Sequence, residues 1–303
     1  MSQENLGGTL PKRALVLLNA RARSGSDGSA ASALDVLRQA GMRLLDPEPG
    51  ERPFREIIRE YAGQADLVVL GGGDGTLRAS AAALMEAGLP LGILPLGTAN
   101  DLARTLTIPT DVTAAAAVIA ADHRRAVDLG EVNGQLFFNV ASIGFSADLA
   151  RSLTAAAKKR WGKLGYAIAA FKLLRQSRPF SVEIEHDGVT ERVRTVQISV
   201  GNGRFYGGGM AVAANAAPDD GLLDVYSLEV EHWWELVALA PSLRFGTQGR
   251  WKKVRTFQTT ALSLSTRRPH DVNADGDLAS STPASFRIHR KALSVFVPGR
   301  QSA

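Results

Sequence analysis

The sequence predicts an α/β fold with two parts: an N-terminal doubly wound α/β nucleotide-binding domain and a C-terminal antiparallel β-sandwich domain. In the first third, short apolar runs alternate with helical patterns, which is typical of βαβ units around a parallel sheet. From about Asp128 onward, β-rich segments predominate. We therefore expect an α/β domain over residues 1–128 and a β-rich lipid-substrate domain over residues 129–303.

The first domain is expected to contain three strands and two long helices. The expected strands are Ala14–Leu18, Asp66–Leu70 and Leu91–Leu94, and the expected helices are Ala30–Ala40 and Ala79–Ala87. Gly41 and Gly88 stand where helices commonly end, and Pro53 stands where a further helix begins. These signals support the alternation of strands and helices.

The second domain is expected to begin with a hairpin, because Asn133-Gly134 suits a type I′ turn. The expected strands are Gln135–Ser142, Phe180–His186, Val193–Gly201, Leu223–Leu228, Phe257–Ser265 and Ser285–His289. Two helical insertions are expected, at Ala147–Gln176 and Glu231–Phe245. The apolar segment Ala292–Val297 is β-branched and could return as a last strand to either domain.

Composition excludes several classes of function. The chain of 303 residues has no cysteine, which excludes disulfides, thiolate metal sites and a cysteine nucleophile. It has no apolar run long enough to span a bilayer, and Met1–Lys12 does not read as a secretory signal. We therefore expect a cytoplasmic protein. The net charge of +5 fits attraction to anionic lipid, nucleic acid or phosphorylated ligands without choosing among them.

A glycine-rich run follows the strand expected at residues 66–70. It reads Gly71-Gly72-Gly73-Asp74-Gly75-Thr76 and leads into a helix. Glycines permit positive φ and let backbone N–H groups approach a phosphate, and the helix offers its positive N-terminal end. Thr76 adds a hydroxyl donor, and Asp74 a carboxylate near phosphates or their Mg²⁺. A tight turn without a ligand would need only one or two glycines, so we interpret the run as a phosphate-binding loop.

A second loop follows the next expected strand and also leads into a helix. It reads Pro95-Leu96-Gly97-Thr98-Ala99-Asn100-Asp101-Leu102-Ala103-Arg104. Both loops would lie at the carboxyl ends of strands, where open α/β sheets bind ligands. Thr98 and Asn100 could bond phosphate or ribose, whereas Asn100 or Asp101 could equally cap the following helix.

The two loops together resemble the diacylglycerol kinase catalytic family, especially its bacterial lipid-kinase branch. The similarity continues through residues 139–145, 201–202, 207–209, 218–224 and 275–277, and so spans nearly the whole chain. The resemblance implies a nucleotide domain, a β-rich domain, and a cleft between them in which ATP phosphorylates a lipid hydroxyl.

The resemblance also implies roles for individual residues. The residues expected around ATP are Asn19, Gly71, Gly72, Gly73, Asp74, Gly75, Thr76, Leu77, Arg78, Gly97, Thr98 and Asn100. The family's general base comes from an Asp-Gly-Glu segment, where this chain has Asp275-Gly276-Asp277. Asp277 is thus the candidate base, and Asp275 and Asp74 complete the expected catalytic set. Without the resemblance, residues 273–277 would read as a polar turn between strands.

A structural Mg²⁺ site is implied around the Asp-Gly-Leu stretch. By position it would use the Asp220 carboxylate and the carbonyl oxygens of Ala217 and Leu222, which are hard ligands suited to Mg²⁺. The same residues taken alone read first as a β-turn.

The chain departs from the family pattern at three places. Arg78-Ala79 stands where the family commonly has Asn-Glu, and Asp277 is one methylene shorter than the family's Glu. The early loop keeps Asn19 but lacks the family's proline. The departures at Asp277 and Arg78 leave open a catalytically silent nucleotide or lipid sensor.

Two basic and aromatic segments are candidates for contact with an anionic membrane. One is Arg151–Arg178, which could instead be an amphipathic helix packed on the β domain. The other joins Trp233-Trp234 with Arg250-Trp251-Lys252-Lys253, although we expect at least one tryptophan of the pair to pack in the core.

These observations predict an ATP-dependent, Mg²⁺-requiring lipid kinase that acts on diacylglycerol or a related lipid alcohol. Its expected partners are the lipid substrate and the inner face of the membrane, without nucleic acid, and self-association is left open. An NAD kinase-like small-molecule kinase is the enzymatic alternative, because such enzymes share a Gly-Gly-Asp-Gly loop.

Overall fold

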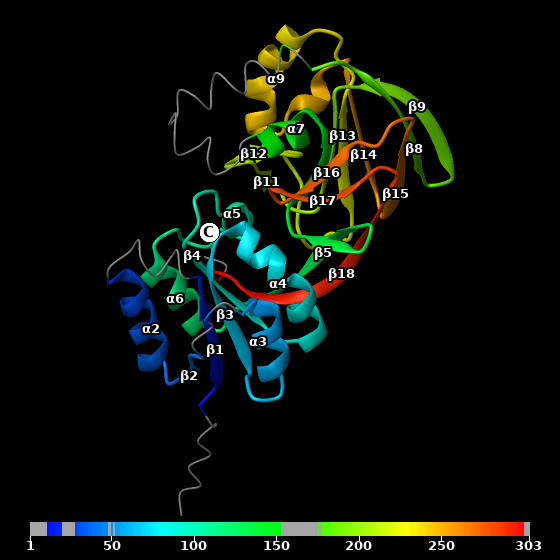
Figure 1. Cartoon of the computed structure of the whole chain (residues 1–303). Helices are drawn as coiled ribbons and strands as arrows, with labels where there is room; N and C mark the ends of the chain where they lie inside the picture. The colour runs from blue at the N-terminus through cyan, green and yellow to red at the C-terminus, as the bar shows by residue number, and fades with distance from the viewer. Residues whose placement is uncertain are drawn as a thin grey trace, which may run out of the picture.

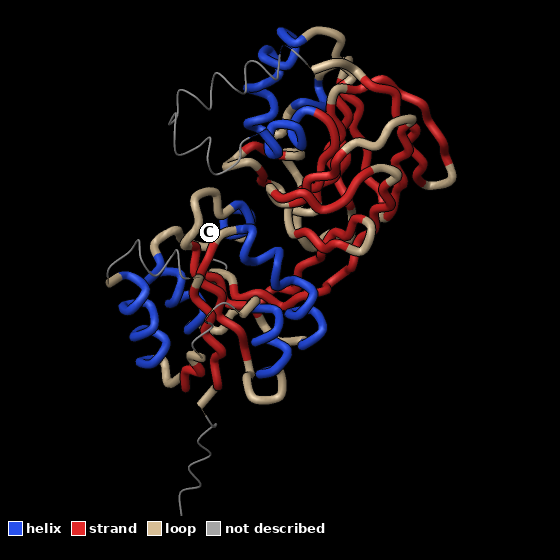
Figure 2. The backbone as a smooth tube through the Cα atoms, in the orientation of Figure 1, coloured by secondary structure: helices blue, strands red, loops and turns tan. Residues whose placement is uncertain are grey.

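The computed structural model describes residues 11–19, 28–47, 50, 52–152, 175 and 177–299 (Figure 1). Figure 2 shows a lower part in which helices surround a sheet and an upper part built mainly of strands. The predicted combination of an α/β domain and an antiparallel β sandwich is confirmed.

The lower part is a parallel sheet with helices on both faces. Its strands are β1 (Arg13–Leu18), β2 (Arg43–Leu45), β3 (Leu67–Gly72) and β4 (Leu91–Pro95), in the order β2-β1-β3-β4. Its helices are α2 (Ser29–Gln39), α3 (Phe54–Tyr61), α4 (Asp74–Ala87), α5 (Asp101–Thr105) and α6 (Val112–Ala120). The helices α2 and α6 pack together on one face, and α3 packs on α4 on the other (Figure 1). All strands therefore direct their carboxyl ends to one edge.

The upper part is a sandwich of two antiparallel layers. One layer has the order β14-β13-β10-β7-β16-β17; the other contains β15, β8 and β9. The bounds are β5 (Arg124–Val132), β6 (Gln135–Phe137), β7 (Val140–Gly144), β8 (Phe180–His186), β9 (Val189–Thr195), β10 (Gln197–Gly201), β13 (Leu223–Leu228), β14 (Val254–Thr259), β15 (Ala261–Thr266), β16 (Asp271–Ala274) and β17 (Asp277–Ser281). A short pair, β11 (Phe205–Tyr206) and β12 (Met210–Ala211), lies beside them. Apolar side chains such as Ile143, Ile184 and Leu264 fill the space between the layers.

One long strand, β18 (Ala284–Phe296), joins the two parts. Its first half pairs with β15 in the sandwich, and Val295 pairs in parallel with Leu91 of β4. It also runs antiparallel to β5 along most of its length. In Figure 1 it passes in red from the upper part to the lower. The two segments that the sequence separated, 285–289 and 292–297, thus belong to a single element.

Three segments that were each expected to form one strand form two strands instead, and the two strands lie in different layers. The expected segments correspond to β6 and β7, β9 and β10, and β14 and β15. Single residues, Val196 and Thr260, separate the last two pairs. Apolar and polar residues alternate on both sides of the Val196 and Thr260 junctions, so the pattern alone does not reveal where the chain crosses from one layer to the other.

The two helical insertions have different outcomes. Helix α7 (Phe145–Ser152) begins near the expected position, but most of the basic segment 151–178 lies outside the described residues. Helix α9 (Trp233–Phe245) follows the second insertion closely. The expectation that Trp233 or Trp234 packs in the core is wrong, because both are exposed and Leu236 and Leu239 fill the buried side instead.

Candidate active site

The glycine run is the end of a strand and the start of a helix rather than a separate loop. Gly71 and Gly72 pair within the sheet as part of β3, and α4 begins at Asp74. The expected positive φ is wrong here, because Gly73 has φ −106°. What these positions require is the absence of a side chain: a Cβ on Gly72 would stand 2.6 Å from Thr76 Oγ1.

The two loops predicted to bind phosphate touch each other. A Cβ on Gly97 would stand 2.4 Å from the Cα of Gly73, so the backbones are in direct contact. Asn100 supports this approach with its side chain, because its Oδ1 accepts the Gly97 N–H at 3.0 Å and its Nδ2 donates to the Gly97 carbonyl at 2.9 Å. Asn100 precedes α5 in a left-handed conformation without a side-chain capping bond. Thr98, which lies between Gly97 and Asn100 in the sequence, is exposed.

Asp74 caps the second loop. Its two carboxylate oxygens accept the backbone N–H groups of Asp101 and Leu102, both at 3.1 Å. Asp101 is buried and in turn accepts the Gly208 N–H at 3.0 Å. Burial raises the pKa of Asp101, and the charge of Asp74 adds to the increase, while the Gly208 bond opposes it. The two loops and the Gly207–Gly209 turn are therefore held together by carboxylates.

A cavity of about 510 Å³ opens beside the glycine run. Asn19 lines it, and its Nδ2 donates to Thr76 Oγ1 at 3.2 Å. Arg52, Phe54 and Arg55 also line it, and the sequence did not predict them. Pro53 was a helix-start signal there, but only the packing of α3 on α4 places this turn beside Thr76.

The candidate base reaches the glycine run from the other domain. Asp277 Oδ2 lies 3.5 Å from the Cβ position of Gly75 and 3.2 Å from Arg78 Nη2. The Arg78 side chain is largely buried, and its Nε has no hydrogen-bond partner among the described residues. Arg78, which departs from the family pattern, thus pairs with Asp277, a second departure.

Asp275 has a different environment from Asp277. It is partly buried, and its carboxylate accepts the backbone N–H groups of Phe138, Asn139 and Val140 at 2.7 to 3.1 Å. Burial raises the pKa of Asp275 to about 6 against the effect of these three bonds. Both Asp275 and Gly276 have positive φ. The carboxylate therefore anchors the turn that presents Asp277.

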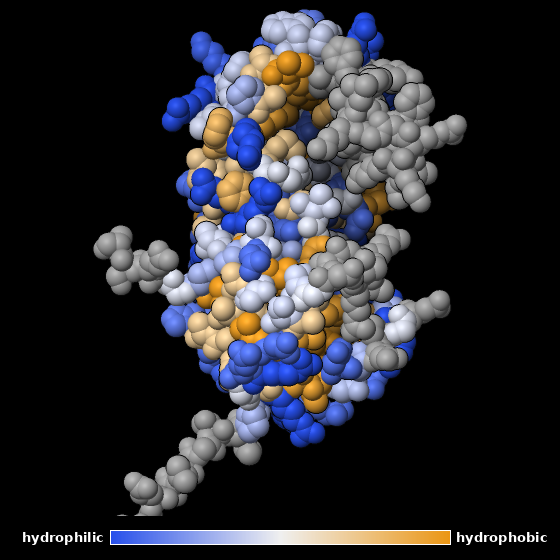
Figure 3. All heavy atoms as spheres, turned by 90° about the vertical axis from the view of Figure 1, so that its left-hand side faces the viewer, coloured by the Kyte–Doolittle hydropathy of each residue, from blue (hydrophilic) through white to orange (hydrophobic). Residues whose placement is uncertain are grey.

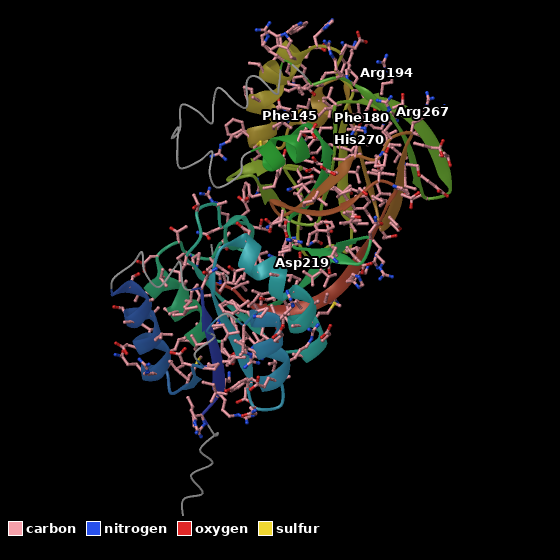
Figure 4. All side chains as sticks on the ribbon, in the orientation of Figure 1. Phe145, Phe180, Arg194, Asp219, Arg267 and His270 are labelled. Carbon is pink, nitrogen blue, oxygen red and sulfur yellow. The ribbon has the colours of Figure 1, made fainter. Side chains whose placement is uncertain are left out.

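Carboxylates gather around the turn proposed to hold a metal. Asp220 accepts the Leu222 N–H at 2.9 Å, and Asp128 accepts the Gly221 N–H at 2.7 Å. Asp219 pairs with Arg125 of β5, near the junction of the domains (Figure 4). Burial raises the pKa of Asp220, and the charges of Asp128 and Asp219 add to this. A cation would relieve these charges, and the carboxylate and carbonyl oxygens of this turn are the kind of ligand that Mg²⁺ prefers. The described residues contain no group of three or more His, Cys, Asp or Glu side chains arranged for a metal.

Two family models match the chain in series. Residues 13–132 match the diacylglycerol kinase catalytic domain, and residues 139–297 match the YegS C-terminal NAD kinase beta sandwich-like domain. No helix in the described part of the chain is long and apolar enough to cross a membrane.

Relatives and solved structures agree with these matches. The Pseudomonas fluorescens "Probable lipid kinase YegS-like" is 33% identical over 295 residues, covering 95% of this chain and 96% of its own. A Mycobacterium tuberculosis diacylglycerol kinase is 35% identical and covers 89% of this chain and 90% of its own. A Bacillus anthracis crystal structure, described as "a putative diacylglycerol kinase", superposes with a TM-score of 0.81 at 26% identity, covering 97% of this chain and 98% of that one. The chain therefore belongs to the diacylglycerol kinase catalytic family, in its bacterial lipid-kinase branch, and is a kinase.

Proposed function

We propose that this kinase transfers the γ-phosphoryl group of ATP to the hydroxyl of diacylglycerol or a related lipid alcohol, and that it requires Mg²⁺. The observation that carries this proposal is the position of Asp277 beside Gly75 and Arg78. It brings a carboxylate from the β-rich domain to the start of α4 in the nucleotide domain. A base is needed where the acceptor hydroxyl meets the γ-phosphate.

The nucleotide is proposed to lie along the cavity beside Thr76, with its phosphates at the start of α4. Gly72, Gly73 and Gly97 carry no side chain, so their backbone N–H groups can approach the phosphates. The positive end of the α4 dipole also favours negative charge at this place. Arg55 makes no ion pair with another described residue and is the cation on the cavity wall open to a phosphate or base.

The chemical step is assigned to residues from both domains. Asp277 orients the acceptor hydroxyl and takes its proton as the oxygen bonds to the γ-phosphorus and the bond to the β–γ bridging oxygen breaks, releasing ADP. The Arg78 guanidinium, already at this position, stabilises charge on the transferring group. Asp275 acts as a positioning residue, because its three backbone bonds fix the turn before Asp277.

Mg²⁺ is proposed in two roles. When bound to the nucleotide, it would neutralise phosphate charge during transfer. A second ion would be held by the Asp220 carboxylate with the Ala217 and Leu222 carbonyl oxygens, where it would balance Asp128 and Asp219. That ion would stabilise the junction between β5 and the 217–222 turn.

The test uses the purified full chain, radiolabelled ATP and a panel of acceptors with and without Mg²⁺. We expect label in diacylglycerol or another lipid alcohol and none without Mg²⁺. Label in soluble alcohols alone would overturn the lipid assignment.

NAD is included in the panel because the C-terminal family model is described as NAD kinase-like. Preferential phosphorylation of NAD would favour the small-molecule kinase. ATP binding without turnover on any acceptor, unchanged in Asp277→Ala, would favour the sensor.

The same proposal includes a domain boundary between residues 128 and 129. It also places the protein at the inner face of the membrane. The sandwich would hold the lipid, and the parallel-sheet domain would hold ATP. Limited contact with the bilayer would suffice, because the acceptor hydroxyl lies near the headgroups.

A further inference from the structure

Helix α9 is apolar on two opposite sides. Leu236 and Leu239 pack against the six-stranded sheet, where they join a buried cluster. The opposite side consists of Trp234, Val237, Pro241 and Phe245, which follow one another at helical spacing, and we call it the α9 outer face. Trp234 is 55% exposed, Val237 50% and Phe245 69%. A helix that is apolar all round is normally buried, so this face is suited to a partner.

Basic and aromatic residues extend the α9 outer face. Trp251 is 40% exposed and is tied to the helix, because its Nε1 donates to Ser242 Oγ at 2.9 Å. Arg250 and Lys252 flank this indole, are exposed, and form no ion pair with any described residue. Cations thus stand beside exposed indole and phenyl rings.

The surface view agrees with this arrangement. Figure 3 shows apolar residues at the upper end of the molecule, over the β-rich domain, with hydrophilic residues beside them, and further apolar residues on the lower part of the same face. Large exposed apolar groups with two cations beside them match the boundary between acyl chains and anionic headgroups. A protein partner would require complementary acidic groups for Arg250 and Lys252, whereas an anionic bilayer supplies that charge everywhere.

The same helix is linked to the active site. Arg244, near its C-terminal end, donates to the Gly209 carbonyl. The adjacent Gly208 N–H bonds Asp101, whose own N–H bonds Asp74. A ligand on α9 therefore sits at one end of a chain of contacts that ends at the start of α4.

We propose that the α9 outer face, with Trp251, Arg250 and Lys252, is the surface by which this kinase docks on an anionic bilayer. The inference rests on the proposed lipid-kinase function and assigns the contact to one face. The rings enter the interface, and the two cations remain at the headgroups. The Arg244–Gly209 bond then connects the docked helix to the Gly208 and Asp101 contacts of the candidate active site.

The experiment measures sedimentation of the full chain with phosphatidylcholine vesicles, with and without phosphatidylglycerol. Trp234→Ser with Phe245→Ser is expected to weaken binding to the anionic vesicles by about tenfold or more, because apolar area no longer enters the interface. Arg250→Gln with Lys252→Gln is expected to weaken it by about 30-fold and to remove the preference for phosphatidylglycerol. Val189→Ser, which changes an exposed apolar residue elsewhere, is the matched control and should bind like the parent.

Each variant is also assayed on a short-chain diacylglycerol presented without a bilayer. Parental turnover on this substrate, with reduced turnover on vesicles, supports docking through α9 and shows that the variants fold. Vesicle binding unchanged in both double variants overturns the docking surface while leaving the kinase assignment intact. Light scattering that shows a dimer dissociated by Trp234→Ser with Phe245→Ser would also overturn it, because a second copy would then cover the face.

Discussion

The carboxylates of Asp74, Asp275 and Asp277 lie near the glycine run but have different hydrogen-bond partners. Asp74 and Asp275 accept backbone N–H groups, whereas Asp277 meets a side-chain cation, Arg78. A carboxylate that accepts several backbone bonds is fixed in place, and an exposed one such as Asp277 can exchange partners. The hydrogen-bond partners of these carboxylates therefore distinguish the positioning residues Asp74 and Asp275 from the candidate base Asp277.

Asp277→Asn is expected to reduce turnover by about 100-fold or more, because the amide cannot take the proton of the acceptor. ATP binding should change little, since Asp277 belongs to the other domain. Initial rates with labelled ATP and calorimetric titration with ATP measure the two quantities. Asp277→Glu, which restores the family residue, should retain activity, and near-parental turnover in Asp277→Asn would remove the role of base.

Asp74→Asn is expected to abolish most turnover while the protein stays folded. The amide can accept only one of the two N–H groups of Asp101 and Leu102, so the second loop loses its support at a cost of about 1–3 kcal/mol. Asp111→Asn is the control, because Asp111 caps α6 away from the site by accepting the Ala114 N–H. Equal turnover in the two variants would contradict the assignment.

The raised pKa of Asp275 predicts that the free energy of unfolding depends on pH. Its pKa is about 6 in the folded chain against the usual aspartate value of 3.8, so the folded state binds more protons than the unfolded state between these pH values. The contribution of Asp275 to the free energy of unfolding is therefore largest below pH 4, and it decreases by about 3 kcal/mol as the pH rises to 6. We expect the free energy of unfolding of the parent, relative to Asp275→Asn, to fall over this range in urea titrations. Parallel curves for the two proteins would contradict the prediction.

At the scale of elements, the site depends on how closely two strand ends approach. The carboxyl ends of β3 and β4 meet at Gly73 and Gly97 without intervening side chains. The helices that follow, α4 and α5, are joined by the Asp74 carboxylate. The motif is thus a packing requirement of adjacent elements as much as a phosphate-binding surface.

Gly97→Ala tests that requirement. Its new Cβ would overlap Gly73 Cα, and relief of this contact should lower the free energy of unfolding by about 1–3 kcal/mol and weaken ATP binding. Gly63→Ala is the matched control, because a Cβ there meets nothing within 4 Å. Denaturant unfolding and ATP titration provide the readouts, and identical behaviour of the two variants would argue against the close approach.

At the scale of the whole molecule, β18 makes the two parts depend on each other. Phe286 fills the sandwich core, while Leu293, Val295 and Phe296 belong to the core of the α/β domain. Because one continuous strand contributes to both cores, separate unfolding of either would break its pairing with the other. We expect a single cooperative transition.

Phe296→Ala is expected to lower the free energy of unfolding by about 3 to 5 kcal/mol through loss of a buried ring. Differential scanning calorimetry should show one transition that moves as a whole to lower temperature. Two resolved transitions, with only one shifted by Phe296→Ala, would show that β18 does not couple the domains.

The sequence by itself determined the fold class, the long helices, and the motifs that identify the family. Strands such as Leu223–Leu228 were predictable because their apolar residues and flanking turns are local features. The crossings at Val196 and Thr260, the walls formed by Arg52 and Arg55, and the partner of Arg78 were decided only by the tertiary structure. Each depends on residues distant in the chain, and neither periodicity nor motif spacing encodes such contacts.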